Sequence, residues 1–287
     1  MNVIESPVIF GDTECEIAEN PLWDDRTNTL YWRGRRGDLY RKKCGDPSAE
    51  IESVELKEVI GGFVFGERDG ELILLGEKGK IRHYQWGGIP RELTVLPGSS
   101  DGTLINDVIA SPDGSIFLGV LMDYFFDKEK QNGLPGSMWK FCRDGSLIQL
   151  EKNAGNIPNG MAFSPDLSKF YFAVTDHRCI YEYKYPAMTE KRTISLGYCP
   201  DGITVDRHGR IWVADCGKHI CCHTPDGTLL KKYYFPGIWG ITSVIIGDGK
   251  LYFTTMNHQK NPEYPMGKVY ELEIGEPGIP EFRFSFC

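Results

Sequence analysis

Four residues with an oxygen-bearing side chain recur at matching positions along the 287-residue chain, and together they could hold a metal ion. They are Glu19, Asn106, Asn159 and Asp201. Two carboxylates and two amides supply hard oxygen ligands whose charge nearly cancels that of a divalent cation, so calcium, magnesium, manganese and zinc are all candidates. Without a cation, two carboxylates in a narrow channel would repel each other. A bound ion could polarise a carbonyl and make a bound water more acidic, which predicts hydrolysis.

The four residues open repeats of a longer pattern, in which alternating apolar residues are followed by a tight turn and an aromatic-rich strand. Six repeats begin near Glu19, Gly62, Asn106, Asn159, Asp201 and Ser243. Successive starts lie 43, 44, 53, 42 and 42 residues apart, and a repeat of this length holds four short strands. The pattern predicts an all-β fold, a six-bladed β-propeller, in which equivalent positions of successive blades meet at the central channel.

The repeat also predicts how the chain is organised. We expect one propeller domain over residues 1–287. Residues 3–10 are interpreted as a further strand before the first repeat, and residues 281–286 alternate after the last one. An open ring would leave two unpaired sheet edges, so the N-terminal strand is expected to pair with the C-terminal strand of the last blade. The extra length between the third and fourth repeats lies in residues 123–137, where charge, Gly and Pro replace alternation. This segment is predicted to form a loop over one mouth of the ring.

Each of the four polar residues has an ordinary structural explanation as well. Glu19 could cap a turn, Asn159 and Asp201 each precede a glycine, and Asn106 precedes Asp107. Such pairs are common in turns, and taken singly each residue is more often part of a turn than a ligand. Their recurrence at one position of the repeat favours a shared site.

Composition excludes some classes of function. The formal net charge of −8 argues against sequence-independent binding of nucleic acid, which needs a basic face. The first ten residues lack the basic region and long apolar run of a signal peptide, and no window approaches the length of a membrane span. We therefore expect a cytoplasmic protein that binds a small-molecule substrate and neither nucleic acid nor a membrane. The number of subunits stays open.

Nine cysteines are scattered without paired spacing, so they are interpreted as reduced thiols. His219, Cys221 and His223 alternate and would share one face of a strand, where a metal could bind. The absence of a partner motif favours the alternative, a structural strand with apolar cysteines and surface histidines.

Four motifs occur in the order and spacing of a known family. They are AENPLW at 18–23, LINDVIASPDG at 104–114, PNGMAFSPD at 158–166 and PDGITVDRHGRIWVA at 200–214. Nearly the whole chain resembles the SMP-30/gluconolactonase/luciferin-regenerating-enzyme family, which includes regucalcin. The resemblance implies a six-bladed propeller with one divalent cation in the channel, and hydrolysis of sugar lactones. It implies that Glu19, Asn159 and Asp201 are metal ligands, that Asp201 is also the general base, and that Asn106 and Asp107 lie beside the substrate and the water shell of the metal.

Around this implied site the chain departs from the family pattern. The departures are Leu104 in place of a usual arginine, Val120 and Leu121 in place of a Thr-Met pair, and Gly34 in place of an acidic residue. Gly34 lies between Arg33 and Arg35. We hypothesise that Arg33 or Arg35 replaces the missing arginine and binds a carboxylate or phosphate of the substrate. Two solvated arginines at a blade edge are the alternative.

The sequence therefore predicts a metal-dependent hydrolase that opens a sugar lactone or a related cyclic ester. The ion would bind the carbonyl oxygen, and Asp201 or the ion would activate water. Two alternatives remain, because a fold does not fix a function. One is a non-catalytic propeller that binds a metal and a small ligand, and the other is a lyase that uses the carboxylate to abstract a proton.

Overall fold

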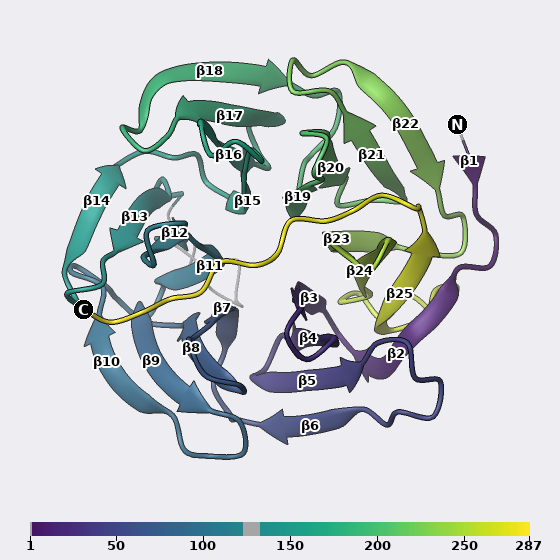
Figure 1. Ribbon diagram of the computed structural model, residues 1–287, viewed down its shortest axis with the longest axis horizontal. Coiled ribbons are helices and arrows are strands. Elements are labelled where there is room, and N and C mark those ends of the chain that lie inside the picture. Colours follow the sequence, from purple (N-terminus) through teal and green to yellow (C-terminus); the bar gives the residue numbers. More distant parts are fainter. Residues whose placement is uncertain (1, 123–132) are drawn as a thin grey trace.

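A computed structural model describes residues 2–122 and 133–287, whose strands form a ring of six blades around a central channel (Figure 1). The first strand of each blade lies at the hub, and the following strands pair outward in order. The prediction of an all-β, six-bladed propeller is confirmed. Among these residues there is no apolar helix of membrane-spanning length.

The first four blades each take four consecutive strands. Blade one contains β3 (Ala18–Asp24), β4 (Thr29–Gly34), β5 (Asp38–Lys43) and β6 (Glu52–Glu55). Blade two contains β7 (Ile60–Phe65), β8 (Glu71–Gly76), β9 (Lys80–Gln85) and β10 (Arg91–Val95). Blade three contains β11 (Leu104–Ala110), β12 (Ile116–Leu121), β13 (Ser137–Phe141) and β14 (Leu147–Glu151). Blade four contains β15 (Pro158–Phe163), β16 (Lys169–Val174), β17 (Cys179–Lys184) and β18 (Thr189–Ser195).

The last two blades also take strands from the N-terminus. Blade five contains β19 (Ile203–Val205), β20 (Ile211–Ala214), β21 (His219–His223), β22 (Leu229–Tyr234) and β1 (Asn2–Val3), which is parallel to β22. Blade six contains β23 (Gly240–Gly247), β24 (Lys250–Met256), β25 (Gly267–Glu273) and β2 (Val8–Cys15), which is antiparallel to β25. The predicted closure of the ring is confirmed. The closing strand starts at Val8, after Pro7, which has no N–H for a sheet ladder.

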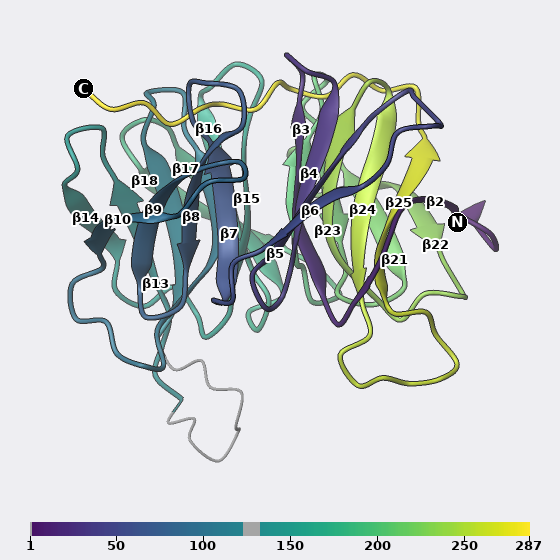
Figure 2. The same cartoon turned by 90° about the horizontal axis from the view of Figure 1, so that it is seen from below.

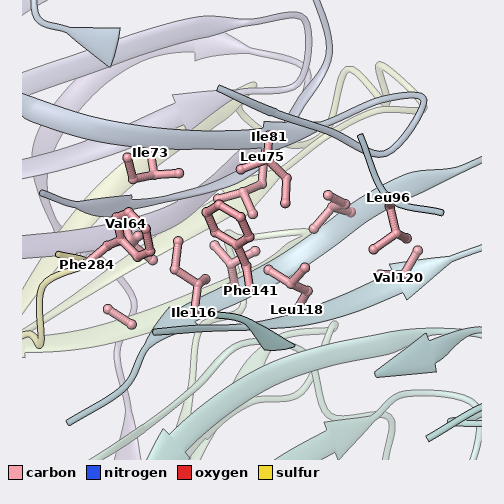
Figure 3. Close-up of a cluster of buried hydrophobic side chains, with 13 residues drawn as sticks. Val64, Ile73, Leu75, Ile81, Leu96, Ile116, Leu118, Val120, Phe141 and Phe284 are labelled. Atoms are coloured by element: carbon pink, nitrogen blue, oxygen red, sulfur yellow. The ribbon is translucent and has the colours of Figure 1, made fainter. Parts of the chain in front are cut away.

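Apolar side chains fill the spaces between neighbouring blades. Between blades two and three, Ile73 and Leu75 pack with Ile116 and Leu118, and Phe284 from the C-terminal segment joins them (Figure 3). The alternating residues 281–286 form no strand. They belong to a segment that crosses one face of the ring, drawn in yellow in Figures 1 and 2. One mouth of the channel therefore lies under the C-terminal segment.

The innermost strands carry irregularities at the positions where the polar residues recur. The pairing register shifts between Glu19 and Leu22 in β3, between Ile105 and Asp107 in β11, and between Pro158 and Met161 in β15. A β-bulge turns a side chain away from the regular alternation of a strand, and bulges are common beside functional sites. The bulges thus allow Asn106 and Asn159 to point along the channel while their neighbours keep packing in the core.

Candidate functional site

A cavity of about 790 Å³ opens at one end of the channel, and it brings together six of the residues predicted from the sequence. They are Glu19, Arg33, Arg35, Asn106, Asn159 and Asp201. Met256 and His258, at the start of the connection from β24 to β25, line the same cavity. That connection projects from the face opposite the C-terminal segment (Figure 2). Of the predicted loop, residues 123–132 lie outside the described residues, whereas Gly133 and Leu134 line the cavity.

Asp107 lies elsewhere in the channel. It lines a second cavity of about 70 Å³, together with Asn20 and with Glu281 of the C-terminal segment. Its carboxylate accepts a hydrogen bond from the N–H of Val108 at 2.7 Å. Asp107 therefore lies on the side of the ligand residues that faces the C-terminal segment, and its contact with substrate stays a prediction.

The turn explanation is wrong for three of the four polar residues, whereas Asp201 lies in a connection between strands. Glu19, Asn106 and Asn159 lie within the innermost strands β3, β11 and β15, and Asp201 lies two residues before β19. The glycines that follow Asn159 and Asp201 do not have positive φ angles. They are needed because neighbouring blades approach closely, and a Cβ at residue 202 would overlap the side chain of Ser243.

Hydrogen bonds between blades fix the residues around the cavity. Arg33 Nε donates to the carbonyl oxygen of Gly61 at 2.7 Å, Asn106 Nδ2 to Pro158 at 3.0 Å, Thr175 Oγ1 to Pro200 at 2.7 Å, and Thr242 Oγ1 to Ala18 at 2.7 Å. Each bond joins one blade to the next. The positions of the site residues are therefore set by closure of the ring.

The orientation of the Asn159 amide follows from its partners. Thr175 has one hydroxyl hydrogen, which it donates to Pro200, so its oxygen must accept the bond that Asn159 Nδ2 makes at 3.0 Å. A further hydrogen bond joins the Asn159 side chain to Asp201. These contacts use the amide nitrogen and leave Asn159 Oδ1 as an acceptor, which is the atom that a cation requires.

The carboxyl groups of the channel have raised pKa values. Burial raises the pKa of Asp201 well above its usual value, and the charges of Glu19 and Asp107 raise it further. Burial also raises the pKa of Glu19, although the guanidinium of Arg33 and the hydrogen bond from the N–H of Asn20 oppose that shift. Burial and the charge of Glu19 raise the pKa of Asp107 to about 7. Three carboxylates thus compete in one channel, which favours a bound cation.

The donor set fits a divalent cation with hard oxygen ligands. Glu19 and Asp201 supply carboxylate oxygens and Asn159 an amide oxygen around the same cavity. Among residues 2–122 and 133–287, no group of three or more His, Cys, Asp or Glu could hold a metal, so the set depends on the amide as a third ligand. At the other metal site considered from the sequence, formed by His219, Cys221 and His223, both histidines have hydrogen-bond partners within the protein. His219 Nδ1 lies 2.6 Å from a carboxylate oxygen of Asp215, and His223 Nε2 lies 2.7 Å from the hydroxyl oxygen of Tyr198.

Three residues of the site were not predicted from the sequence. Thr175 orients Asn159, Thr242 lines the cavity and bonds to Ala18 beside Glu19, and Cys216 forms a hydrogen bond with Asp201. The nine cysteines are free thiols, and burial beside Asp201 raises the pKa of Cys216. Thr175 and Cys216 each follow the second strand of their blade, so a scan of that repeat position for hydroxyls and thiols could have found them.

Comparisons with known proteins show the family to which the chain belongs. The pentonolactonase XacC of Haloferax volcanii is 29% identical, with 95% of this chain and 96% of that protein aligned. A 6-deoxy-6-sulfogluconolactonase of Pseudomonas putida is 26% identical, with 99% and 97% aligned. In structure, a luciferin-regenerating enzyme superposes with a TM-score of 0.84 at 22% identity, covering 98% of this chain and all of that one. Residues 17–257 match the SMP-30/Gluconolactonase/LRE-like region, and the chain belongs to this family.

Proposed function

We propose that this protein is a metal-dependent lactonase that hydrolyses a sugar lactone or a related cyclic ester. The observation that carries the proposal is the convergence of Glu19, Asn159 and Asp201 on one cavity at the end of the channel. Two relatives that align over nearly their whole length are named for the hydrolysis of sugar lactones, which supports the same class of reaction here.

Glu19, Asn159 and Asp201 would hold the cation. When bound, it would supply a Lewis acid for the lactone carbonyl and would lower the pKa of water. If Glu19, Asp107 and Asp201 are all ionised, they and the guanidiniums of Arg33 and Arg35 leave a net negative charge in the channel, which a divalent cation more than offsets. The residues present therefore suit a divalent ion in charge as well as in ligand type.

The chain itself provides the proton transfers. Asp201 would accept a proton from the water that attacks the carbonyl carbon. As that C–O bond forms, the ring C–O bond breaks, and Asp201 returns the proton to the departing ring oxygen. Asn106 uses one N–H of its amide on Pro158 and can donate the other to a substrate oxygen. The product is a hydroxy acid, which releases a proton at neutral pH.

Proton release provides the test. Metal-stripped protein is supplied with each of calcium, magnesium, manganese and zinc, and acid production is followed with five- and six-membered sugar lactones. Acid production only with a metal supports the proposal. An unsaturated product would indicate elimination, and binding without acid would indicate a non-catalytic protein, and either outcome overturns the proposal.

The role of Asp201 has its own test. Because a positioned base contributes about two to four decades in rate, Asp201→Ala should lose about that much turnover even at full metal occupancy. Occupancy is checked by calorimetry under the assay conditions. Near-normal turnover in the metal-loaded variant would remove the role of general base.

A further inference from the structure

We propose that the lactone accepted by this cavity carries a negatively charged group at the end remote from its carbonyl, and that Arg35 binds this group. The inference rests on the proposed lactonase function and names the class of its substrate. A carboxylate, a sulfonate or a phosphate would meet the requirement, because all three present oxygen acceptors that match a guanidinium.

The pairing of β3 with β4 gives the depth of each arginine in the channel. Glu19 pairs with Arg33 and Ala18 pairs with Gly34, so Arg33 lies at the level of the metal ligands. Strand β4 starts near the C-terminal segment, where Asp24 at the end of β3 contacts Arg283 at 2.5 Å. It therefore runs toward the face that carries the cavity.

Arg35 follows one residue after the end of β4 and lines the cavity beyond Arg33. Two residues of extended chain span up to about 7 Å. This separation exceeds the distance from the carbonyl carbon to the last carbon of a sugar lactone, whose ring holds the two close together, and a phosphate or sulfonate on that last carbon would extend the molecule toward Arg35. A substrate whose carbonyl lies at the ligand residues would thus place its far end at Arg35.

Arg33 and Arg35 differ in burial and in the contacts that each makes. Arg33 is 7% exposed, bonds to Gly61, and shifts the pKa values of Glu19 and Asp107 downward. Arg35 is half-buried in the cavity wall. Both also have contacts within the protein. Because a guanidinium has five N–H donors, Arg35 can keep its contacts and still bind an anion.

The charge of the cavity wall favours an anion once the metal is bound. The described wall carries two carboxylates, Glu19 and Asp201, and two guanidiniums. A divalent cation would neutralise the carboxylates and leave the wall positive, in a protein whose net charge is −8. Among the described wall residues, blades three and four contribute no basic side chain, whereas Arg33 and Arg35 both belong to blade one, so the anionic end is expected to turn toward blade one.

The test compares three substrates of the metal-loaded enzyme: neutral glucono-1,5-lactone, 6-phosphoglucono-1,5-lactone and 6-deoxy-6-sulfoglucono-1,5-lactone. We expect kcat/KM to be about 10- to 100-fold higher for at least one anionic lactone, because hydrogen bonds to charged groups are stronger than neutral ones. Arg35→Gln should abolish this preference, so that the neutral and anionic lactones react with similar kcat/KM. Comparison of the phosphorylated lactone with the sulfonated lactone shows which of the two anionic groups the enzyme prefers.

Arg36→Gln is the matched control. Arg36 is the next residue, but its side chain is 73% exposed and lies 3.4 Å from Glu16, and it does not line the cavity. Its substitution should preserve the preference. Equal kcat/KM for neutral and anionic lactones in the natural protein, or a preference that survives in Arg35→Gln, overturns the inference and leaves the lactonase function intact.

If the protein opens no lactone, the proposed function is wrong. Measurements of binding then test separately whether Arg35 binds the anionic group. Calorimetry with 6-phosphogluconate and gluconate should show tighter binding of the phosphate compound to the natural protein and to Arg36→Gln, but not to Arg35→Gln. Equal binding of the two acids to all three proteins would contradict the inference that Arg35 binds the anionic group.

Discussion

The side-chain amide of Asn159 donates from Nδ2 to the hydroxyl oxygen of Thr175 at 3.0 Å, and this bond fixes which end of the amide faces the cavity. Thr175 can only accept that bond because its own hydrogen is donated to Pro200 at 2.7 Å. A threonine at the end of one strand therefore sets the orientation of a candidate metal ligand on the neighbouring strand.

Removing this hydroxyl should weaken metal binding. Thr175→Val frees the amide of Asn159 to rotate, and partners that orient ligands typically contribute about 10- to 100-fold in affinity. Thr175→Ser keeps the hydroxyl and should bind metal within about threefold of the natural protein. Calorimetric titration of the metal-stripped proteins measures both. An unchanged Kd in the valine variant would contradict the role of Thr175.

Glu281 should make stability depend on pH. Burial raises the pKa of this carboxyl from 4.5 to about 8, and the charge of Asp25 adds to the shift while Arg283 opposes it. The folded protein then holds a proton that the unfolded chain releases, so the contribution is complete below pH 4.5 and is lost as the pH rises to about 8. Glu281→Gln should be more stable than the natural protein at pH 9 and equal to it at pH 4.

Denaturant unfolding at the two pH values measures this effect. Glu67→Gln is the matched control, because Glu67 is exposed. The control should leave the difference between the two pH values unchanged. A Glu281→Gln variant with the same pH dependence as the natural protein would show that Glu281 is not a source of it.

The C-terminal segment should stabilise the ring through one side chain. Phe284 is 2% exposed, and its ring stacks on Phe141 with centroids 5.3 Å apart. Truncation of a buried phenylalanine costs about 3–5 kcal/mol, so Phe284→Ala should lower the free energy of unfolding by about that amount. Phe286, two residues later, is 44% exposed, and Phe286→Ala should cost far less. Similar losses in both variants would rule out this anchoring contact.

Gly61 should not tolerate a side chain. A Cβ at this position would overlap the carbonyl oxygen of Ile105, and the carbonyl of Gly61 itself holds Arg33. Gly61→Ala is therefore expected to lose about 1–3 kcal/mol of stability, because neighbouring backbones would have to separate. Gly197→Ala is the control, since a Cβ there would meet no atom within 4 Å. Equal thermal unfolding of the two variants would count against the close packing of blades two and three.

The sequence predicted the ring because its signal is periodic. Each repeat carries the same alternation and turns, and hub positions recur at the same phase, so Glu19, Asn106, Asn159 and Asp201 could be placed in one cavity without coordinates. The closing strand followed from the cost of an open sheet edge.

Other features of the site and the fold depend on contacts between strands or between blades. Such contacts leave no local pattern in the sequence. Asp107 follows Asn106 directly, yet the bulge in β11 places it in the smaller cavity on the other side. Thr175 bonds to Asn159 within blade four, and Cys216 bonds to Asp201 within blade five, but the hydrogen of Thr175 goes to Pro200 of the next blade, which is what makes Thr175 an acceptor. Residues 281–286 alternate like a strand but run across the face of the ring, where Phe284 packs between blades.

The proposed function depends on the binding of one divalent cation by Glu19, Asn159 and Asp201 at the hub. The most direct measurement is an anomalous difference map from crystals soaked in manganese or zinc, with data collected on both sides of the absorption edge of the metal. The account predicts a single strong peak at the hub within coordination distance of all three side chains. A hub without a peak after soaking, or a peak bound by other residues, would contradict it.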